Sequence, residues 1–161
     1  MNKFFLDDLT ERLNTIFDGV QILDQKSVKG HLVFLDMTRK FPMICNEYTQ
    51  DSNIDVDIDE SKFLNDKSYN GIWILGGSED TIDFILCLKT YEQILFIDVL
   101  EVNSEMRNQG IGGNVVSIIE SVAEQYFSAI FVSPFDTDAI NFWEHMEYCQ
   151  EKNCNWIKPL N

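Results

Sequence analysis

The spacing of apolar residues divides the first part of the chain into three predicted elements. Residues 4–17 carry apolar side chains three and four positions apart, with acidic residues between them, which predicts an amphipathic helix ending near Gly19. Residues 20–23 and 31–35 are short β-type runs on either side of a turn-prone Lys-Gly pair. No period holds for long between residues 38 and 70, which are polar and acid-rich.

From residue 71 the apolar pattern predicts an antiparallel meander of three strands. These strands cover residues 72–75, 82–88 and 94–102. A turn at 76–80 and a short connection at Tyr91-Glu92 join them.

The C-terminal half is predicted to continue as helix, strand and helix. A helix over about 112–127 has one apolar stripe, and a short buried strand at 129–132 follows it. A last helix over 137–146 has Asp136 as its predicted N-cap, and residues 148–157 supply terminal strand material. The order of elements is therefore mixed α/β, and no internal repeat or linker interrupts it.

Length and charge narrow the class of protein. A chain of 161 residues is expected to form one domain, here residues 1–161. Its 27 acidic against 12 basic residues give a formal net charge of −15, which disfavours nucleic acid and anionic membranes as partners. The first ten residues resemble neither a signal peptide nor a membrane span.

The cysteines indicate reduced thiols rather than a metal site or a disulfide framework. Cys45, Cys87, Cys149 and Cys154 form no CxxC motif and have no nearby histidine pair. We therefore expect a cytoplasmic protein without a metal site.

Residues 107–113, Arg-Asn-Gln-Gly-Ile-Gly-Gly, follow a predicted strand and open a predicted helix. Glycines let successive amide N–H groups point at one spot, and a helix N-terminus adds partial positive charge, so this loop is a candidate anion site. It lacks the lysine of a P-loop, and Val115 stands where the dinucleotide fingerprint needs its third glycine. Arg107 is the one Arg or Lys between Thr90 and Glu151, against eleven acidic residues, and it lies at the mouth of the loop.

Two stretches resemble the signatures of the GNAT acetyltransferase superfamily. Residues 102–112 (VNSEMRNQGIG) resemble its acetyl-CoA signature, a strand ending in Val, then x-Pro-x-x-Arg and x-x-Gly-x-Gly or Ala, with Ser104 in place of proline. Residues 139–143 (AINFW) with Glu147-Tyr148 resemble the second signature, Ala-x-x-Phe-Tyr-x-x-x-Gly-Phe, with three replacements. The resemblance covers about residues 71–148, and residues 1–70 form a variable N-terminal part.

The resemblance implies a GNAT-like acyl-CoA N-acyltransferase fold: an α/β (α+β) arrangement whose central, mostly antiparallel sheet is splayed open in a V and flanked by helices. Residues 71–148 would form the acetyl-CoA-binding core, with loop amides around the pyrophosphate and strand backbone along the pantetheine arm. The residues that it assigns to the cofactor are Leu100, Val102, Arg107, Asn108, Gln109, Gly110, Ile111, Gly112, Gly113, Asn141 and Trp143.

Two carboxylates on the strand before the loop are candidate bases, because amide formation from a thioester needs a neutral amine. The positions at which the family places its base fall at Phe96, which cannot act, and at Asp98. Glu101 is the second candidate, although alternation puts it on the opposite face from Asp98 unless a bulge shifts the register. The family's common tyrosine falls at Trp143, whose indole is no practical acid, so solvent or another residue must protonate the thiolate.

Acidic residues before the meander bear on the acceptor. Six acids lie between Asp51 and Asp66 against one lysine. Glu60 stands where a calcium loop needs glycine, and the alternation over 54–59 is typical of a half-buried strand with a solvated face. In the family, segments before the meander often border the acceptor cleft, where carboxylates would attract a cation.

We expect an N-acetyltransferase that moves an acetyl group from acetyl-CoA, its co-substrate, to a primary amine of a cationic small molecule or peptide. Neither nucleic acid, membrane nor metal is expected to take part, and assembly as a homodimer is left open. Phe96 and Trp143 motivate an alternative, an acyl-CoA-binding regulatory or interaction domain with little or no turnover. A protein-interaction module without a ligand is the third interpretation.

Overall fold

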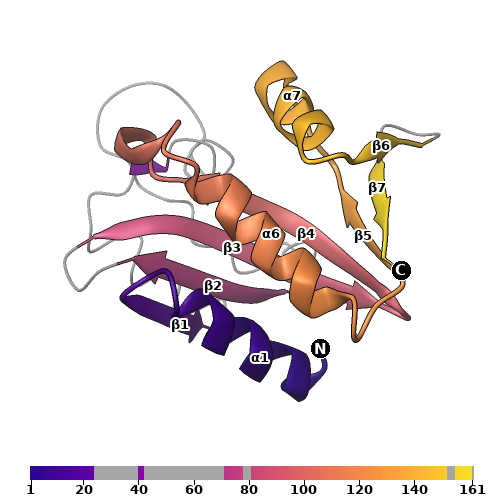
Figure 1. Ribbon diagram of the computed structural model, residues 1–161. Helices are drawn as coiled ribbons and strands as arrows, with labels where there is room; N and C mark the ends of the chain where they lie inside the picture. The colour runs from indigo at the N-terminus through magenta and orange to yellow at the C-terminus, as the bar shows by residue number, and fades with distance from the viewer. Residues whose placement is uncertain (24–39, 42–70, 78–80, 152–154, 161) are drawn as a thin grey trace, which may run out of the picture.

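The computed structural model describes residues 1–23, 40–41, 71–77, 81–151 and 155–160. The strands are β1 (Gly19–Leu23), β2 (Ile72–Gly77), β3 (Ile82–Tyr91), β4 (Ile94–Val102), β5 (Ala129–Val132), β6 (Cys149–Gln150) and β7 (Trp156–Pro159). The helices are α1 (Lys3–Leu13), α6 (Ile111–Ala123) and α7 (Thr137–His145), and a 3-10 turn, η2 (Ser104–Met106), follows β4. The strands form one sheet in the order β1-β2-β3-β4-β5-β7-β6, with α1 and α6 side by side across it (Figure 1).

The sheet is mixed and opens beside β4. Five of the six pairings between the described strands are antiparallel, and only β4 with β5 is parallel. β4 pairs with β5 through Ile97, and residues 98–102 continue past that last pair. The predicted mixed α/β architecture and the predicted antiparallel meander are confirmed.

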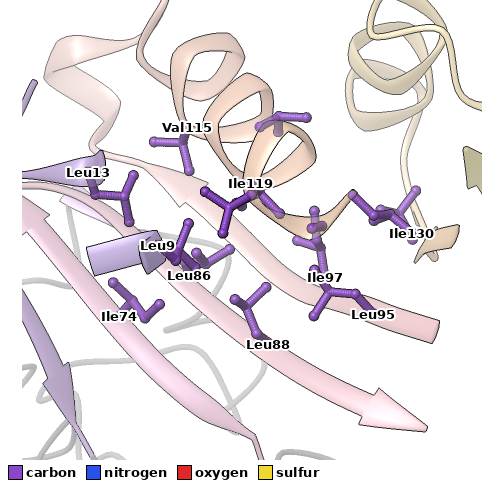
Figure 2. Close-up of a cluster of buried hydrophobic side chains, with 14 of the residues drawn as sticks. Leu9, Leu13, Ile74, Leu86, Leu88, Leu95, Ile97, Val115, Ile119 and Ile130 are labelled. Atoms are coloured by element: carbon purple, nitrogen blue, oxygen red, sulfur yellow. The ribbon is translucent and has the colours of Figure 1, made fainter. Parts of the chain in front are cut away.

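Apolar side chains of α1 and α6 form the main core against one face of the sheet. Figure 2 shows Leu9 and Leu13 of α1 and Ile119 of α6 near the strand residues Ile74 and Leu86. The opposite face, called the second face below, carries a smaller buried cluster of Phe41, Trp73, Leu75, Ile85 and Cys87.

The first helix is shorter than predicted, because apolar spacing continues beyond its end. The amides of Thr15 and Ile16 bond to carbonyls three residues back, and the Thr15 hydroxyl donates to the carbonyl of Arg12 at 2.6 Å. Phe17 is nevertheless buried and packs against the ring of Phe84 at a centroid distance of 4.8 Å. The pattern over 4–17 therefore predicted burial correctly, but the helical end was wrong.

The other boundary errors have similar causes. Helix α6 ends at Ala123, although Tyr126 and Phe127 carry the apolar pattern further and pack edge-on against Phe5. The predicted turn at 76–80 was wrong in its first part, because residues 76–77 belong to β2. A Cβ on Gly76 would collide with the ring of Phe84 on β3, and a Cβ on Gly77 would collide with the carbonyl oxygen of Thr81, just before β3. The close pairing of these strands therefore needs glycine at both positions.

A β-bulge interrupts the pairing of β3 with β4. Cys87 pairs with Val99, whereas Leu88 pairs with Ile97, so Asp98 is the extra residue. The bulge changes which side chains of β4 share a face, and it therefore decides the geometry of the site.

Two expected elements lie outside the described residues: the strand at 31–35 and the acidic segment at 54–60. The expected strands at 20–23, 94–102 and 129–132 and the Asp136 cap of α7 are confirmed. No described helix is long and apolar enough to cross a membrane.

Candidate active site

A buried asparagine anchors the start of the glycine loop. Asn103 directly follows β4 and is 2% exposed. Its Nδ2 donates to the carbonyl of Ile82 at 2.9 Å, its Oδ1 accepts from the amide of Glu105 at 3.1 Å, and its backbone amide donates to the carbonyl of Asp83 at 2.8 Å. These bonds attach the loop to the first residues of β3. Sequence reasoning missed Asn103, although a cap-forming residue directly after a strand was a readable signal.

Helix α6 begins at a glycine, so its N-cap residue has no side chain with which to cap the first amides. Its N-cap, Gly110, is left-handed at φ 80° and ψ 1° and makes no side-chain hydrogen bond to the first turn. The amide of Asn114 bonds to the carbonyl of Gly110 at 2.9 Å, so the amides of Ile111, Gly112 and Gly113 lie in the turn before the helical ladder begins. The positive end of the helix dipole adds to them, and this end suits a phosphate group.

A side chain at position 112 would lie where β4, α6 and α7 converge. A Cβ at this position would lie 3.4 Å from the ring of Phe142 on α7 and 3.5 Å from the side chain of Val102 on β4. Asn141, beside Phe142, is exposed on α7. The two sequence signatures therefore meet in space.

The remaining loop residues are accessible. Asn108 and Gln109 are exposed in the turn before α6, and Asn108 has a positive φ of 63°. Arg107 is also exposed, and its Nε donates to the carbonyl of Val102 at 3.4 Å. Leu100 lies on β4 among the residues 98–102 that run past β5.

The bulge at Asp98 brings the two candidate bases to the same face. Leu100 packs against the main core, so the next residue, Glu101, points to the second face. Asp98 acts electrostatically on the thiol of Cys87, which belongs to the buried cluster of that second face. The alternation that would have separated Asp98 from Glu101 is therefore broken at the bulge.

Each of these carboxylates has a cationic partner. Asp98 forms an ion pair with Lys89 of β3, and both side chains are about a quarter exposed, at 24% and 25%. Oε1 of Glu101 lies 3.5 Å from Nη2 of Arg107, and the Glu101 side chain is only 1% exposed. Asp98 is therefore the more accessible carboxylate. Sequence reasoning missed Lys89, because its pairing with Asp98 depends on the strand register.

The thiol of Cys87, on the same face as Asp98, is unsuited to nucleophilic chemistry. Burial, and then the Asp98 carboxylate, raise the pKa of Cys87 to about 12. Cys87 is also fully buried. Because the thiolate is the reactive form of cysteine, this side chain is a structural member of the second face.

Trp143 belongs to the core. It is 6% exposed and packs edge-on against Phe142 and Tyr148, at centroid distances of 5.0 Å and 4.8 Å. Burial, and then the Glu120 carboxylate, raise the pKa of Tyr148. The hydroxyl of Tyr126 donates to Asp8 at 2.5 Å, and this bond raises its pKa. Both tyrosines therefore have structural roles, Tyr148 in the core and Tyr126 at its edge.

Comparison with known proteins gives a family and a fold. The sequence model of the acetyltransferase (GNAT) family matches residues 35–148. A search of curated proteins found no match. A GNAT-family acetyltransferase from Staphylococcus aureus Mu50 has a TM-score of 0.56 at 16% identity and covers 89% of this chain and 100% of its own.

Two further solved structures share the fold with similar TM-scores. Tetrahymena GCN5 has a TM-score of 0.58 at 10% identity, covering 89% of this chain and 96% of its own. A GNAT-family acetyltransferase from Streptococcus pneumoniae has a TM-score of 0.54 at 13% identity, covering 89% and 100%. With the family match over residues 35–148, the chain belongs to the acetyltransferase (GNAT) family of acyltransferases, which transfer an acyl group from acetyl-CoA to an amine.

Proposed function

We propose that this protein is an N-acetyltransferase that moves the acetyl group of acetyl-CoA to a primary amine. The observation that carries the proposal is the N-terminus of α6, which has the glycine Gly110 as its N-cap and lies beside the end of β4 at Gly112. The residues there fit a CoA diphosphate: successive amides, a helix N-terminus and the guanidinium of Arg107.

The CoA molecule is proposed to lie along the open part of the sheet. Its diphosphate would meet the amides from Gly110 to Gly113, and Asn108 and Gln109 would border it. Its pantetheine arm would follow residues 98–102 of β4, near Leu100 and Val102, where β5 no longer pairs. Asn141, which is exposed on α7, would border the cofactor, whereas Trp143, the other expected cofactor residue of this helix, stays in the core against Phe142 and Tyr148.

Asp98 is proposed as the base. Acetyl-CoA supplies an acyl group activated as a thioester. Asp98 accepts a proton from the acceptor ammonium, directly or through water, and so frees the lone pair that forms the new C–N bond. The C–S bond breaks, the new amide nitrogen releases its second proton to solvent, and solvent returns a proton to the CoA thiolate. Lys89 holds the Asp98 carboxylate in place during this exchange.

Glu101 is the alternative base on the same face. Its side chain is 1% exposed against 24% for Asp98, and this difference in access favours Asp98. The raised pKa and the burial of Cys87 favour direct transfer over an acyl-enzyme.

The acceptor is proposed to be a cationic small molecule or peptide. The net charge of −15 and the six acids between Asp51 and Asp66 support attraction of a cation. Electrostatic steering predicts that kcat/KM falls as ionic strength rises, because the screening length shortens to about 8 Å near 0.15 M salt. Replacing Asp55, Asp57 and Asp59 together by asparagine should flatten this salt response. A best substrate that is neutral or anionic would contradict the proposed class.

A second candidate function is acyl-CoA binding without turnover. It is favoured by Phe96, which stands at one of the two base positions, and by Trp143, which is held in the core. The experiment that separates the two functions incubates the protein with acetyl-CoA and a panel of polyamines, amino sugars and lysine peptides. Equal amounts of free CoA and acetylated amine support the enzyme, whereas CoA binding without any acetylated amine supports the alternative.

A further inference from the structure

Among the described residues, Glu101 is the one charged residue that is buried. Its Oε1 lies 3.5 Å from Nη2 of Arg107, and the Arg107 side chain is 45% exposed. A carboxylate that is taken out of water costs free energy unless a cation or hydrogen-bond donors compensate it. This buried charge on β4 is therefore directly connected to the glycine loop.

The guanidinium of Arg107 is held on two sides. Its Nε donates to the carbonyl of Val102 at 3.4 Å, and its Nη2 faces Glu101. A guanidinium has five N–H donors, so these two contacts leave donors for a further anion. Because the Arg107 side chain is 45% exposed, a ligand can reach these donors from solvent.

We propose that Glu101 is a positioning residue that holds the Arg107 guanidinium at the end of β4, ready for a phosphate group of CoA. This inference rests on the proposed function of the loop. Glu101 then acts through Arg107, and the proton transfer belongs to Asp98. Without Glu101, the long side chain of Arg107 has one contact fewer and must be ordered when the ligand binds.

Simple electrostatics and a positioning role of Glu101 predict opposite changes in CoA affinity when the Glu101 charge is removed. A carboxylate beside an anion site repels a diphosphate, so removing its charge should tighten CoA binding. If Glu101 holds Arg107 in place, the Glu101→Gln variant should instead bind CoA more weakly, by about tenfold.

A double-mutant cycle tests this coupling. The dissociation constant of CoA is measured by titration calorimetry for the full chain, for Glu101→Gln, for Arg107→Ala and for the double variant. If the effect of Glu101 on CoA passes through Arg107, the double variant should bind CoA as Arg107→Ala does, within about twofold. In turnover assays the loss should appear in KM for acetyl-CoA rather than in kcat.

Glu105→Gln is the matched control. Glu105 lies in the 3-10 turn η2 that precedes Arg107. Its side chain is 70% exposed, and its Oε2 lies 3.8 Å from Nζ of Lys40. This substitution removes the same charge without touching Arg107, so CoA affinity should stay equal or rise slightly. Glu101→Asp, which keeps the charge but shortens the side chain, should also weaken binding and serves if the glutamine variant does not fold.

Three outcomes would overturn the proposal. Glu101 variants that are folded and bind CoA as tightly as the unchanged protein, or more tightly, would show that Arg107 does not need this partner. An equal additional loss in the Arg107→Ala background would show that Glu101 acts independently. A selective fall in kcat would make Glu101 a base. Failure of the unchanged protein to bind CoA would remove the proposed function as well, and it is seen before any variant is compared.

Discussion

Replacing Gly112 by alanine should stabilise the fold and weaken CoA binding in the same variant. The new Cβ would lie 3.4 Å from Phe142 and 3.5 Å from Val102, which is ordinary van der Waals contact. Glycine-to-alanine substitution in a helix gains up to about 1 kcal/mol. For a chain of this size, that gain corresponds to an increase in Tm of about 2–4 °C.

The same methyl group would stand next to the amide of residue 112, one of the amides against which we place the phosphate. A hydrogen bond to a charged group contributes about 1.5–3 kcal/mol, so losing this approach weakens CoA binding by roughly 10- to 150-fold. Valine would add two more methyl groups beside Phe142 and Val102, so alanine separates binding from packing more cleanly.

Two neighbouring glycines supply the comparison. At Gly110 no atom lies within 4 Å of an added Cβ, but φ is 80°, which costs an L-residue about 1–2 kcal/mol. Gly110→Ala should therefore lower Tm. Gly113→Ala gains the same helical propensity as Gly112→Ala, but its Cβ faces Met146 at 3.9 Å, away from Val102 and Phe142. It should raise Tm and weaken CoA binding less than Gly112→Ala does.

Scanning calorimetry without ligand gives Tm for each variant, and titration calorimetry gives the dissociation constant of CoA. We expect Tm to rise for Gly112→Ala and to fall for Gly110→Ala. A folded Gly112→Ala protein that binds CoA with unchanged affinity would refute the phosphate position at the start of α6. A large fall in its Tm would refute the packing argument.

Three further predictions concern the proton transfer, the thiol and a buried tyrosine. Asp98→Asn should lower kcat by about 100-fold with little change in the affinity for acetyl-CoA, as measured by steady-state kinetics and calorimetry, and a near-normal rate would exclude it as the base. Cys87→Ala should keep its turnover, and mass spectrometry after mixing with acetyl-CoA should find no acetyl group on the unchanged protein, because a thiol with a pKa of about 12 is protonated at neutral pH. The raised pKa of Tyr148 means that the unfolded chain loses this proton first, so the free energy of unfolding should fall as pH rises above about 10. Tyr148→Phe should reduce that slope in urea titrations, and an unchanged slope would contradict the shift.

Local sequence signals predicted the elements that frame the site. The run of apolar residues over β4, the short strand β5 and the Asp136 cap were readable because each depends on neighbouring residues alone. The glycine loop was readable for the same reason. The ends of α1 and α6 were not, because Phe17 and Phe127 continue the apolar spacing in turns that are not helical, while their rings still pack against Phe84 and Phe5.

The electrostatics of the site depend on contacts between strands and could not be predicted. From the sequence, a bulge in this strand was only the alternative to regular alternation, because its presence depends on the partner strand, and the shared face of Asp98 and Glu101 became visible in the pairing of β3 with β4. The partners Lys89 and Arg107 follow from that register and from the path of the loop. Asn103 was readable as a cap but not as the link to β3.

A crystal structure of the protein with CoA tests the central claim most directly. The account predicts the diphosphate against the amides from Gly110 to Gly113, with Arg107 in contact with a phosphate oxygen. It also predicts the pantetheine arm beside residues 98–102 of β4 and the sulfur within reach of the second face near Asp98. CoA bound elsewhere on the protein, or the start of α6 left empty in crystals grown at saturating CoA, would contradict the account.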